Sequence, residues 1–127
     1  MLVGAYAMAT HGYIRATGDL DIWVETGFEN SKRIAKALSE FGAPSSMYDE
    51  ETFCKEGIVL QLGVDPCRID LITTIDGVDF KEAYRHRKKT KINGIIINVI
   101  SKKDLIKNKR STGRDKDLLD AMMLQKK

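Results

Sequence analysis

Two aspartates, Asp19 and Asp21, are the residues of this sequence whose types and spacing first indicate chemistry. They lie in a stretch that reads as a strand, and residues two apart on a strand point to the same face. Both carboxylates would then lie on one side, while Leu20, Ile22 and Val24 face the core. Carboxylates held side by side repel one another unless a hard cation lies between them, and Mg²⁺ prefers oxygen ligands that it usually shares with substrate phosphates. The pair therefore indicates a magnesium site that faces a phosphate-bearing substrate.

A short strand and a short helix precede these aspartates and would position them. Residues 2–3 form the end of an apolar strand, and Gly4 allows a tight exit from it. Residues 5–10 predict a helix, which His11 and Gly12 would end because glycine is the usual left-handed terminator. The whole stretch therefore reads as strand, helix, loop, strand.

A glycine turn, a helix and an Asp-x-Asp strand in this order resemble the nucleotidyltransferase (polymerase-beta-like) superfamily. The resemblance is to its minimal prokaryotic branch, which includes the AbiE-type toxin and MntA-type antitoxin nucleotidyltransferases. The residues that carry it are Gly4, Ala5, His11, Gly12, Arg15, Thr17, Asp19 and Asp21. Residues 68–71 (RIDL) also resemble the strand that supplies a third carboxylate, and residues 108–110 and 113–117 resemble the closing helical segment of the family.

The resemblance implies roles for individual residues. In such families two carboxylates bind metal and the third helps to activate the attacking hydroxyl. Asp19, Asp21 and Asp70 would then be the catalytic residues and the candidate ligands of two Mg²⁺ ions. The residues that would hold the nucleotide are Gly4, Ala5, Tyr6, Arg15, Thr17, Lys109 and Arg114.

The implied reaction is nucleotide transfer. An acceptor hydroxyl attacks the α-phosphate of a nucleoside triphosphate, the nucleoside monophosphate is transferred, and pyrophosphate is released. In the toxin and antitoxin branch the acceptor is tRNA or a partner protein, and related small enzymes modify antibiotics. The alternative is a catalytically inactive module of the same fold that binds nucleotide, RNA or a partner protein.

Asp-x-Asp alone is a weak signal, because a surface strand with two outward aspartates explains most such matches and because haloacid dehalogenase phosphatases also use it. Those enzymes need an apolar strand directly before the first aspartate, whereas Ala16-Thr17-Gly18 precedes Asp19 here.

The glycine turn leaves a further alternative open. The family turn is usually Gly-Gly or Gly-Ser, where N–H groups and a serine hydroxyl hold the terminal phosphates. In the turn Gly4-Ala5-Tyr6, Ala5 still offers its N–H, and Tyr6 either replaces the hydroxyl or packs.

Several residues near the expected site have two interpretations. Arg15 and Thr17 contact phosphate from the loop, or Arg15 pairs with a nearby aspartate. Lys109 and Arg114 face the triphosphate or lie on a solvated Lys-rich surface. Asp117 is expected to pair with a neighbouring basic residue rather than to bind metal.

Composition indicates one globular domain that spans residues 1–127. Hydrophobic residues make up 43% and charged residues 31% of the 127 residues, and the formal net charge is +3. Lys and Arg are dense in residues 81–91 and 102–116, which form either a solvated surface or a basic rim that attracts triphosphate or nucleic acid. Isolated Cys and His residues make a zinc site unexpected. Without a leader or a long apolar run, we expect a soluble cytoplasmic protein with free thiols that does not enter a membrane.

We expect a small α/β domain whose short mixed sheet carries helices mainly on one face. Thr26 would cap a helix over residues 28–41, with Phe41 on its apolar stripe. Asp115 would cap the last helix, which would bury Leu118, Leu119, Met122 and Met123. Further helices are predicted over 79–87 and 102–109, antiparallel strands over 58–64 and 67–73, and an Asn-Gly hairpin over 89–92 and 95–100.

The start of the chain leads to an expectation about assembly. Met1 lies about one residue before the first strand, whereas members of the resembled branch usually have a helix ahead of it. Either that helix is missing, or another chain covers the apolar surface that it would protect. We therefore expect a homo-oligomer, such as a dimer, or a complex with a cognate partner.

Overall fold

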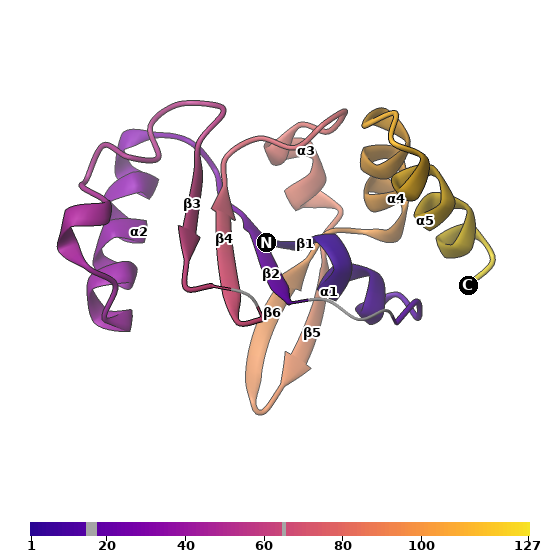
Figure 1. Cartoon of the computed structure of the whole chain (residues 1–127), viewed down its shortest axis with the longest axis horizontal. Helices are drawn as coiled ribbons and strands as arrows, with labels where there is room; N and C mark the ends of the chain where they lie inside the picture. The colour runs from indigo at the N-terminus through magenta and orange to yellow at the C-terminus, as the bar shows by residue number, and fades with distance from the viewer. Residues whose placement is uncertain (15–17, 65) are drawn as a thin grey trace.

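The protein has an α/β fold, as predicted, built on a mixed β-sheet (Figure 1). The computed structural model describes residues 1–14, 18–64 and 66–127. Within these ranges the sheet has six strands in the order β3-β4-β2-β1-β6-β5. The strands are β1 (Leu2–Val3), β2 (Asp19–Trp23), β3 (Val59–Leu62), β4 (Arg68–Ile72), β5 (Lys88–Ile92) and β6 (Ile95–Val99). The β2–β4 and β1–β6 pairs are parallel, and the other neighbouring strands are antiparallel.

The helices lie around the sheet, with α2 at one end of the molecule and α4 and α5 at the other (Figure 1). Those of the described residues are α1 (Gly4–Thr10), α2 (Phe28–Phe41), α3 (Phe80–Arg85), α4 (Lys102–Ser111), α5 (Asp115–Gln125) and the 3₁₀ helix η1 (Ser45–Met47). Gly12, with a φ of 97°, follows the end of α1 as expected. In the described part of the chain no helix combines the length and apolar character that crossing a membrane requires.

Two apolar clusters hold the helices to the sheet. The first fixes α2 to the strands and contains Leu38, Phe53, Leu62 and Leu71. The second joins α1, β1, β2, β6, α3, α4 and α5, and its largest buried side chains are Met8, Trp23, Val99, Ile100, Leu105 and Leu124. Leu20 packs against the second cluster and Ile22 and Val24 against the first, as expected from their alternation with the aspartates.

The start of α2 differs from the prediction. Its N-cap is Gly27 rather than Thr26, and no side chain caps the helix. Gly27 has a φ of 133°, which favours glycine, and this turn leaves Thr26 outside the helix. At the other end, Phe41 is 67% exposed although it was predicted to be buried. It lies at the rim of an apolar groove of about 330 Å³ between α2 and the sheet, so this last turn is not fully packed.

The last helix is rotated relative to the prediction. Arg114, not Asp115, is the N-cap of α5, and the predicted apolar stripe is largely exposed. Leu118, Leu119 and Met122 are 39%, 55% and 54% exposed. The buried residues of α5 are instead Asp117, Asp120, Ala121 and Leu124. The reason is electrostatic, because Asp117 and Asp120 face the ammonium of Lys109 on α4.

β1 is the short link between the two halves of the sheet. Leu2 pairs with Ile22 of β2 and with Val99 of β6, and Val3 pairs with Asp21. The β5–β6 hairpin extends well beyond this link (Figure 1). Its turn, Asn93-Gly94, has left-handed φ values of 51° and 80°, as the Asn-Gly pair predicted.

Candidate active site

Three carboxylates meet on adjacent strands. In the parallel pairing of β2 and β4, Asp19 is the partner of Arg68, and Asp21 is the partner of Asp70. Partners in a ladder lie side by side and point to the same face. All three carboxylates line one cavity of about 460 Å³. The sequence therefore predicted correctly which acidic residues come together, and their catalytic and metal-binding roles remain a prediction.

Arg68 holds two of these carboxylates. Its Nε donates to Asp70 Oδ1 at 2.9 Å, and its Nη2 donates to Asp70 Oδ2 at 3.1 Å and to Asp19 Oδ2 at 2.6 Å. A planar guanidinium that grips one carboxylate with two N–H groups is a strong ion pair. Sequence reasoning did not predict this contact, although the Arg-x-Asp spacing put Arg68 on the same strand face as Asp70.

Asp21 differs from its neighbours. Among the described residues, no hydrogen bond or ion pair reaches its carboxylate. Burial raises the pKa of Asp21 above its ordinary value, and the carboxylates of Asp70 and Asp19 raise it further, against smaller opposing effects of Lys109 and Arg68. The charged form of Asp21 is therefore costly in the free protein, and a cation that binds beside it would relieve the cost.

Gly4 allows α1 to approach Asp21. Its φ is 70°, and a Cβ built at this position would overlap Asp21 Oδ2. Gly4 and Ala5 both line the cavity that the carboxylates share. The absence of a side chain at Gly4 therefore keeps the space beside the Asp21 carboxylate open, which is what a cation or phosphate there would require.

Gly4→Ala is expected to lower both the thermal stability of the protein and its stabilisation by Mg²⁺ and nucleoside triphosphate. A side chain at a left-handed φ costs about 1–2 kcal/mol, and here the clash with Asp21 adds to it. Gly57→Ala is the matched control, because Gly57 has a φ of 78° and nothing within 4 Å of the added Cβ. Thermal melts with and without Mg²⁺ and nucleoside triphosphate measure both effects. Equal destabilisation by the two substitutions, with ligand stabilisation kept in both, would contradict a role for Gly4 in the site.

The opposite wall of the cavity is basic. Lys109, Arg114 and Lys116 line it, and the first two also line an adjoining cavity of about 250 Å³ that reaches Asp21. Sequence reasoning did not include Lys116. Arg114 is 75% exposed at its side chain, so it is accessible to a ligand, whereas Lys109 is 14% exposed. Acidic and basic walls that face each other suit a metal ion bound together with phosphates.

Asp117 organises this basic wall. It accepts from Thr112 Oγ1 at 2.7 Å, from Arg114 Nε at 2.7 Å and from Lys109 Nζ at 3.2 Å. Burial raises the pKa of Asp117, but the Thr112 hydroxyl, Lys109 and Arg114 together hold it below its ordinary value. The expected pairing of Asp117 with a basic neighbour is therefore confirmed. Lys109 also lies 3.5 Å from Asp120 Oδ2, so a buried lysine with two carboxylates joins α4 to α5.

Among the described residues, Tyr6 is the predicted site residue that the cavity does not include. Tyr6 is 44% exposed. His11 caps the end of α1, and its Nε2 lies 2.7 Å from the carbonyl oxygen of Ile100, as suits a helix-end residue. Arg15 and Thr17 lie outside the described residues, so their predicted phosphate contacts stay predictions.

The donor set suits Mg²⁺ when a substrate contributes ligands. In the described residues, no group of three or more His, Cys, Asp or Glu side chains is placed to hold a metal ion. Arg68 explains this in part, since it occupies oxygens of Asp19 and Asp70. Mg²⁺, however, is usually held by one or two carboxylates together with phosphates and water. Asp21, with open space beside Gly4, and Asp19 on the same strand face fit that requirement.

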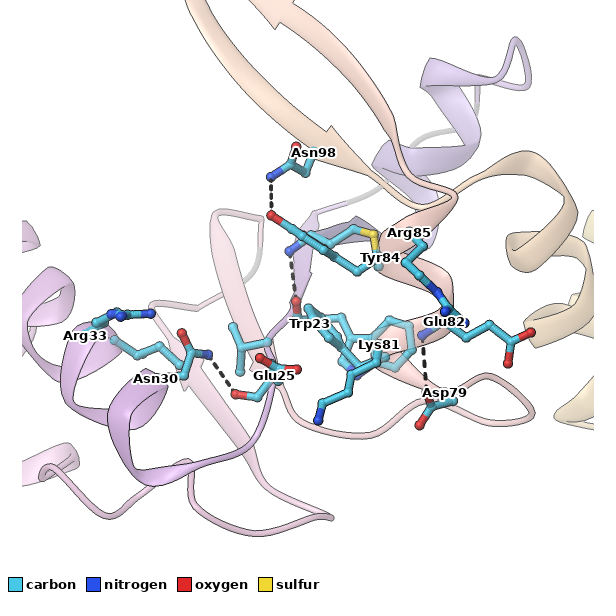
Figure 2. Close-up of a pocket in the computed structure, with 14 residues that line it drawn as sticks. Trp23, Glu25, Asn30, Arg33, Asp79, Lys81, Glu82, Tyr84, Arg85 and Asn98 are labelled. Carbon is cyan, nitrogen blue, oxygen red and sulfur yellow. Dashed lines mark hydrogen bonds between the residues drawn. The ribbon is translucent and has the colours of Figure 1, made fainter.

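A larger cavity lies elsewhere, between α2 and α3 (Figure 2). Its volume is about 800 Å³, and none of the three clustered aspartates lines it. Two of its polar side chains bond to neighbouring lining residues: Asn98 donates to the Tyr84 hydroxyl, and Asn30 donates to the carbonyl of Glu25. Figure 2 shows Tyr84 and Trp23 on one side of this space and Asn30 and Arg33 on the other. This cavity therefore has room but lacks the acidic cluster, and we place the candidate site at the aspartates.

Comparison with known proteins supports the fold assignment. No family model matches the sequence. No curated protein matches it either. Among solved structures, the chain is similar to a "putative nucleotidyltransferase" from Thermotoga maritima, with a TM-score of 0.56 and 17% identity over 99% of this chain and 79% of that one. The likeness shows that this chain has a nucleotidyltransferase-like fold.

Proposed function

We propose that this chain is a Mg²⁺-dependent nucleotidyltransferase, which transfers a nucleoside monophosphate from a nucleoside triphosphate to an acceptor hydroxyl. The observation that carries the proposal is the cavity in which Asp19, Asp21 and Asp70 face Lys109 and Arg114. Carboxylates suit a hard cation, and basic side chains suit phosphate. The likeness of the fold to a protein described as a "putative nucleotidyltransferase" supports the same reaction class.

Each wall of the cavity has a role in this proposal. Asp19 and Asp21 hold up to two Mg²⁺ ions, which when bound neutralise the phosphates and stabilise the departing pyrophosphate. Asp70 orients the acceptor hydroxyl and accepts its proton. The acceptor oxygen forms a bond to the α-phosphorus while the bond to the β-phosphate oxygen breaks. Lys109 and Arg114 hold the charge of the triphosphate through this exchange.

The direct test is transfer of label from nucleotide to acceptor. The protein is incubated with Mg²⁺, total RNA or cell protein, and each nucleoside triphosphate labelled at the α- or the γ-phosphate. We expect α-label in a macromolecule and γ-label in released pyrophosphate. Asp19→Asn serves as the inactive control. Absence of both signals with every triphosphate and acceptor pool, for a folded protein, would reject the proposal.

One observation favours a second candidate, a catalytically inactive module that binds nucleotide, RNA or a partner protein. Arg68 occupies oxygens of Asp19 and Asp70, and the turn Gly4-Ala5-Tyr6 lacks the serine of the resembled family. Such a module binds nucleotide without releasing pyrophosphate. Saturable nucleotide binding with no label transfer distinguishes it from the enzyme.

Arg114→Gln is expected to weaken binding of a triphosphate more than binding of the matching monophosphate. The exposed guanidinium lines the cavity and can turn from Asp117 to added phosphate charge. Titration calorimetry with both nucleotides in the presence of Mg²⁺ measures the difference. Equal losses for the two nucleotides, or no loss, would assign Arg114 to the solvated surface.

We also propose that the chain works in an assembly, as a homo-oligomer or with a cognate partner such as a toxin or antitoxin chain. The exposed apolar residues Leu118, Leu119 and Met122 on α5 support this proposal. The acceptor would then be RNA, the partner protein or a small molecule. Light scattering of the purified protein tests self-assembly, and a monomer at all working concentrations would leave only the partner complex.

A further inference from the structure

Arg68 uses the carboxylate oxygens that a divalent cation at this site needs. Its Nη2 is shared between Asp19 Oδ2 at 2.6 Å and Asp70 Oδ2 at 3.1 Å, and its Nε takes Asp70 Oδ1 at 2.9 Å. The contacts are sheltered, because the side chains of Arg68 and Asp70 are only 24% and 10% exposed. One guanidinium therefore satisfies three oxygens of two carboxylates.

We propose that Arg68 is the internal counter-cation of the site and competes with the divalent cation for Asp19. In the metal-free protein Arg68 holds Asp19 and Asp70, and a cation gains Asp19 Oδ2 only when Arg68 releases it. Arg68 thus sets the affinity of the site for metal as a positioning residue. The inference rests on the proposed function in one respect, namely that a divalent cation uses this cavity.

The contact is not needed to pair the strands. β2 and β4 already share five consecutive register partners, from Asp19 with Arg68 to Trp23 with Ile72. A purely structural pin between β2 and β4 predicts that removing Arg68 lowers stability and leaves metal affinity unchanged. Competition predicts that removing Arg68 tightens metal binding, because the metal then no longer has to displace the guanidinium and the carboxylates of Asp19 and Asp70 remain in place.

The test is titration of Mn²⁺ alone, without nucleotide, into the parent and Arg68→Met by calorimetry. We expect Arg68→Met to bind Mn²⁺ at least tenfold more tightly than the parent. Arg110→Met is the matched control, because Arg110 is exposed, does not line the cavity and changes the net charge by the same amount. Its affinity for Mn²⁺ is expected to stay within twofold of the parent. A gain in Arg68→Met no larger than in Arg110→Met would overturn the inference.

Two further measurements cover the case in which Arg68→Met does not fold. Arg68→Lys keeps the charge but cannot bridge two carboxylates with a fork, so it is expected to bind Mn²⁺ more tightly than the parent by a smaller factor. In the parent, the ¹⁵N–¹H signal of Arg68 Nε, identified by its loss in Arg68→Lys, is expected to shift when Mg²⁺ is added. An unchanged signal at saturating Mg²⁺, or an unchanged affinity in Arg68→Lys, would contradict the competition.

The outcomes separate this inference from the proposed function. If the parent binds Mn²⁺ and the Arg68 variants bind it no more tightly, the role of Arg68 is wrong and metal use at the site stands. If neither the parent nor any folded Arg68 variant binds Mn²⁺ alone, the inference fails, and the metal-dependent function is decided separately by the label-transfer assay, in which the nucleotide contributes ligands.

Discussion

Asp21→Asn is expected to leave the free protein at least as stable as the parent and to remove most of its stabilisation by Mg²⁺ and nucleoside triphosphate. Burial raises the pKa of the Asp21 carboxyl, and the neighbouring carboxylates of Asp70 and Asp19 raise it further. Removing its charge removes repulsion from the free protein. It also removes an oxygen ligand from the bound cation.

The two effects have opposite signs, and both are measurable by thermal melting. A ligand at 100 times its dissociation constant stabilises the parent by about 2.7 kcal/mol. For a chain of this size that is a shift of about 10 °C in Tm, and the variant should lose most of it. A variant that is less stable when free, or that keeps the full shift, would show that Asp21 has a structural role instead.

The stability gained by Asp21→Asn over the parent is also expected to depend on pH. Because the pKa of Asp21 is raised in the folded protein, the folded state binds its proton more tightly than the unfolded state does. The cost of the charged form is present above the raised pKa and disappears as the pH falls through it. Asp21→Asn should therefore gain most over the parent near neutral pH, and the gain should shrink as the pH falls. Denaturant unfolding across the acidic range checks this trend.

Lys109→Met is expected to cost more stability than any other single charge removal at the site, about 3–5 kcal/mol. The ammonium lies 3.2 Å from Asp117 and 3.5 Å from Asp120, whose side chains are 5% and 2% exposed. Its loss removes the cation that Asp117 and Asp120 share, although Asp117 keeps its contacts with Arg114 and Thr112. Arg114→Met is the control: it also removes a cation from Asp117, but at a side chain that is 75% exposed, so we expect a cost of about 0–1 kcal/mol.

Urea unfolding of the two variants measures the difference. In the parent, the pKa of Asp117 is lower in the folded than in the unfolded protein. The ionised carboxylate therefore stabilises the fold at pH values above the unfolded-state pKa, and this stabilisation is lost as the pH falls through the folded-state pKa. Lys109→Met should weaken that dependence on pH. Similar and small losses of unfolding free energy in both variants would show that the ion pairs of Lys109 contribute little to stability. Phosphate binding would then be the main role of Lys109.

Local patterns in the sequence were sufficient for much of the fold and for the acidic part of the site. The alternation of Asp19 and Asp21 with apolar residues predicted both the strand and the face that carries the carboxylates. Asn93-Gly94 predicted a hairpin because two successive left-handed residues admit few other structures. These features depend on residues that are close in the sequence.

The features that were missed depend on contacts between distant segments. Arg68 and Asp19 are 49 positions apart, and only the register of β2 on β4 shows that they meet. The predicted orientation of α5 was wrong, because apolar periodicity placed leucines and methionines on its buried face. The buried face contains Asp117 and Asp120, which the ammonium of Lys109 on α4 compensates. No pattern within α5 alone reveals that partner.

The two-residue strand β1 has a mechanical consequence for the site. It is the strand that joins β2 and β4, which carry the carboxylates, to β6 and β5, and Leu2 is its one register partner with β6 among the described residues. Few backbone hydrogen bonds therefore resist a hinge motion about this point, and the main resistance comes from the apolar cluster that spans it, which contains Trp23 of β2 and Val99 of β6. The cavity between the acidic strands and the basic α4–α5 pair lies next to this hinge, since Val3 pairs with Asp21. Rotation about β1 would therefore open or close the two walls around a nucleotide only by repacking this cluster.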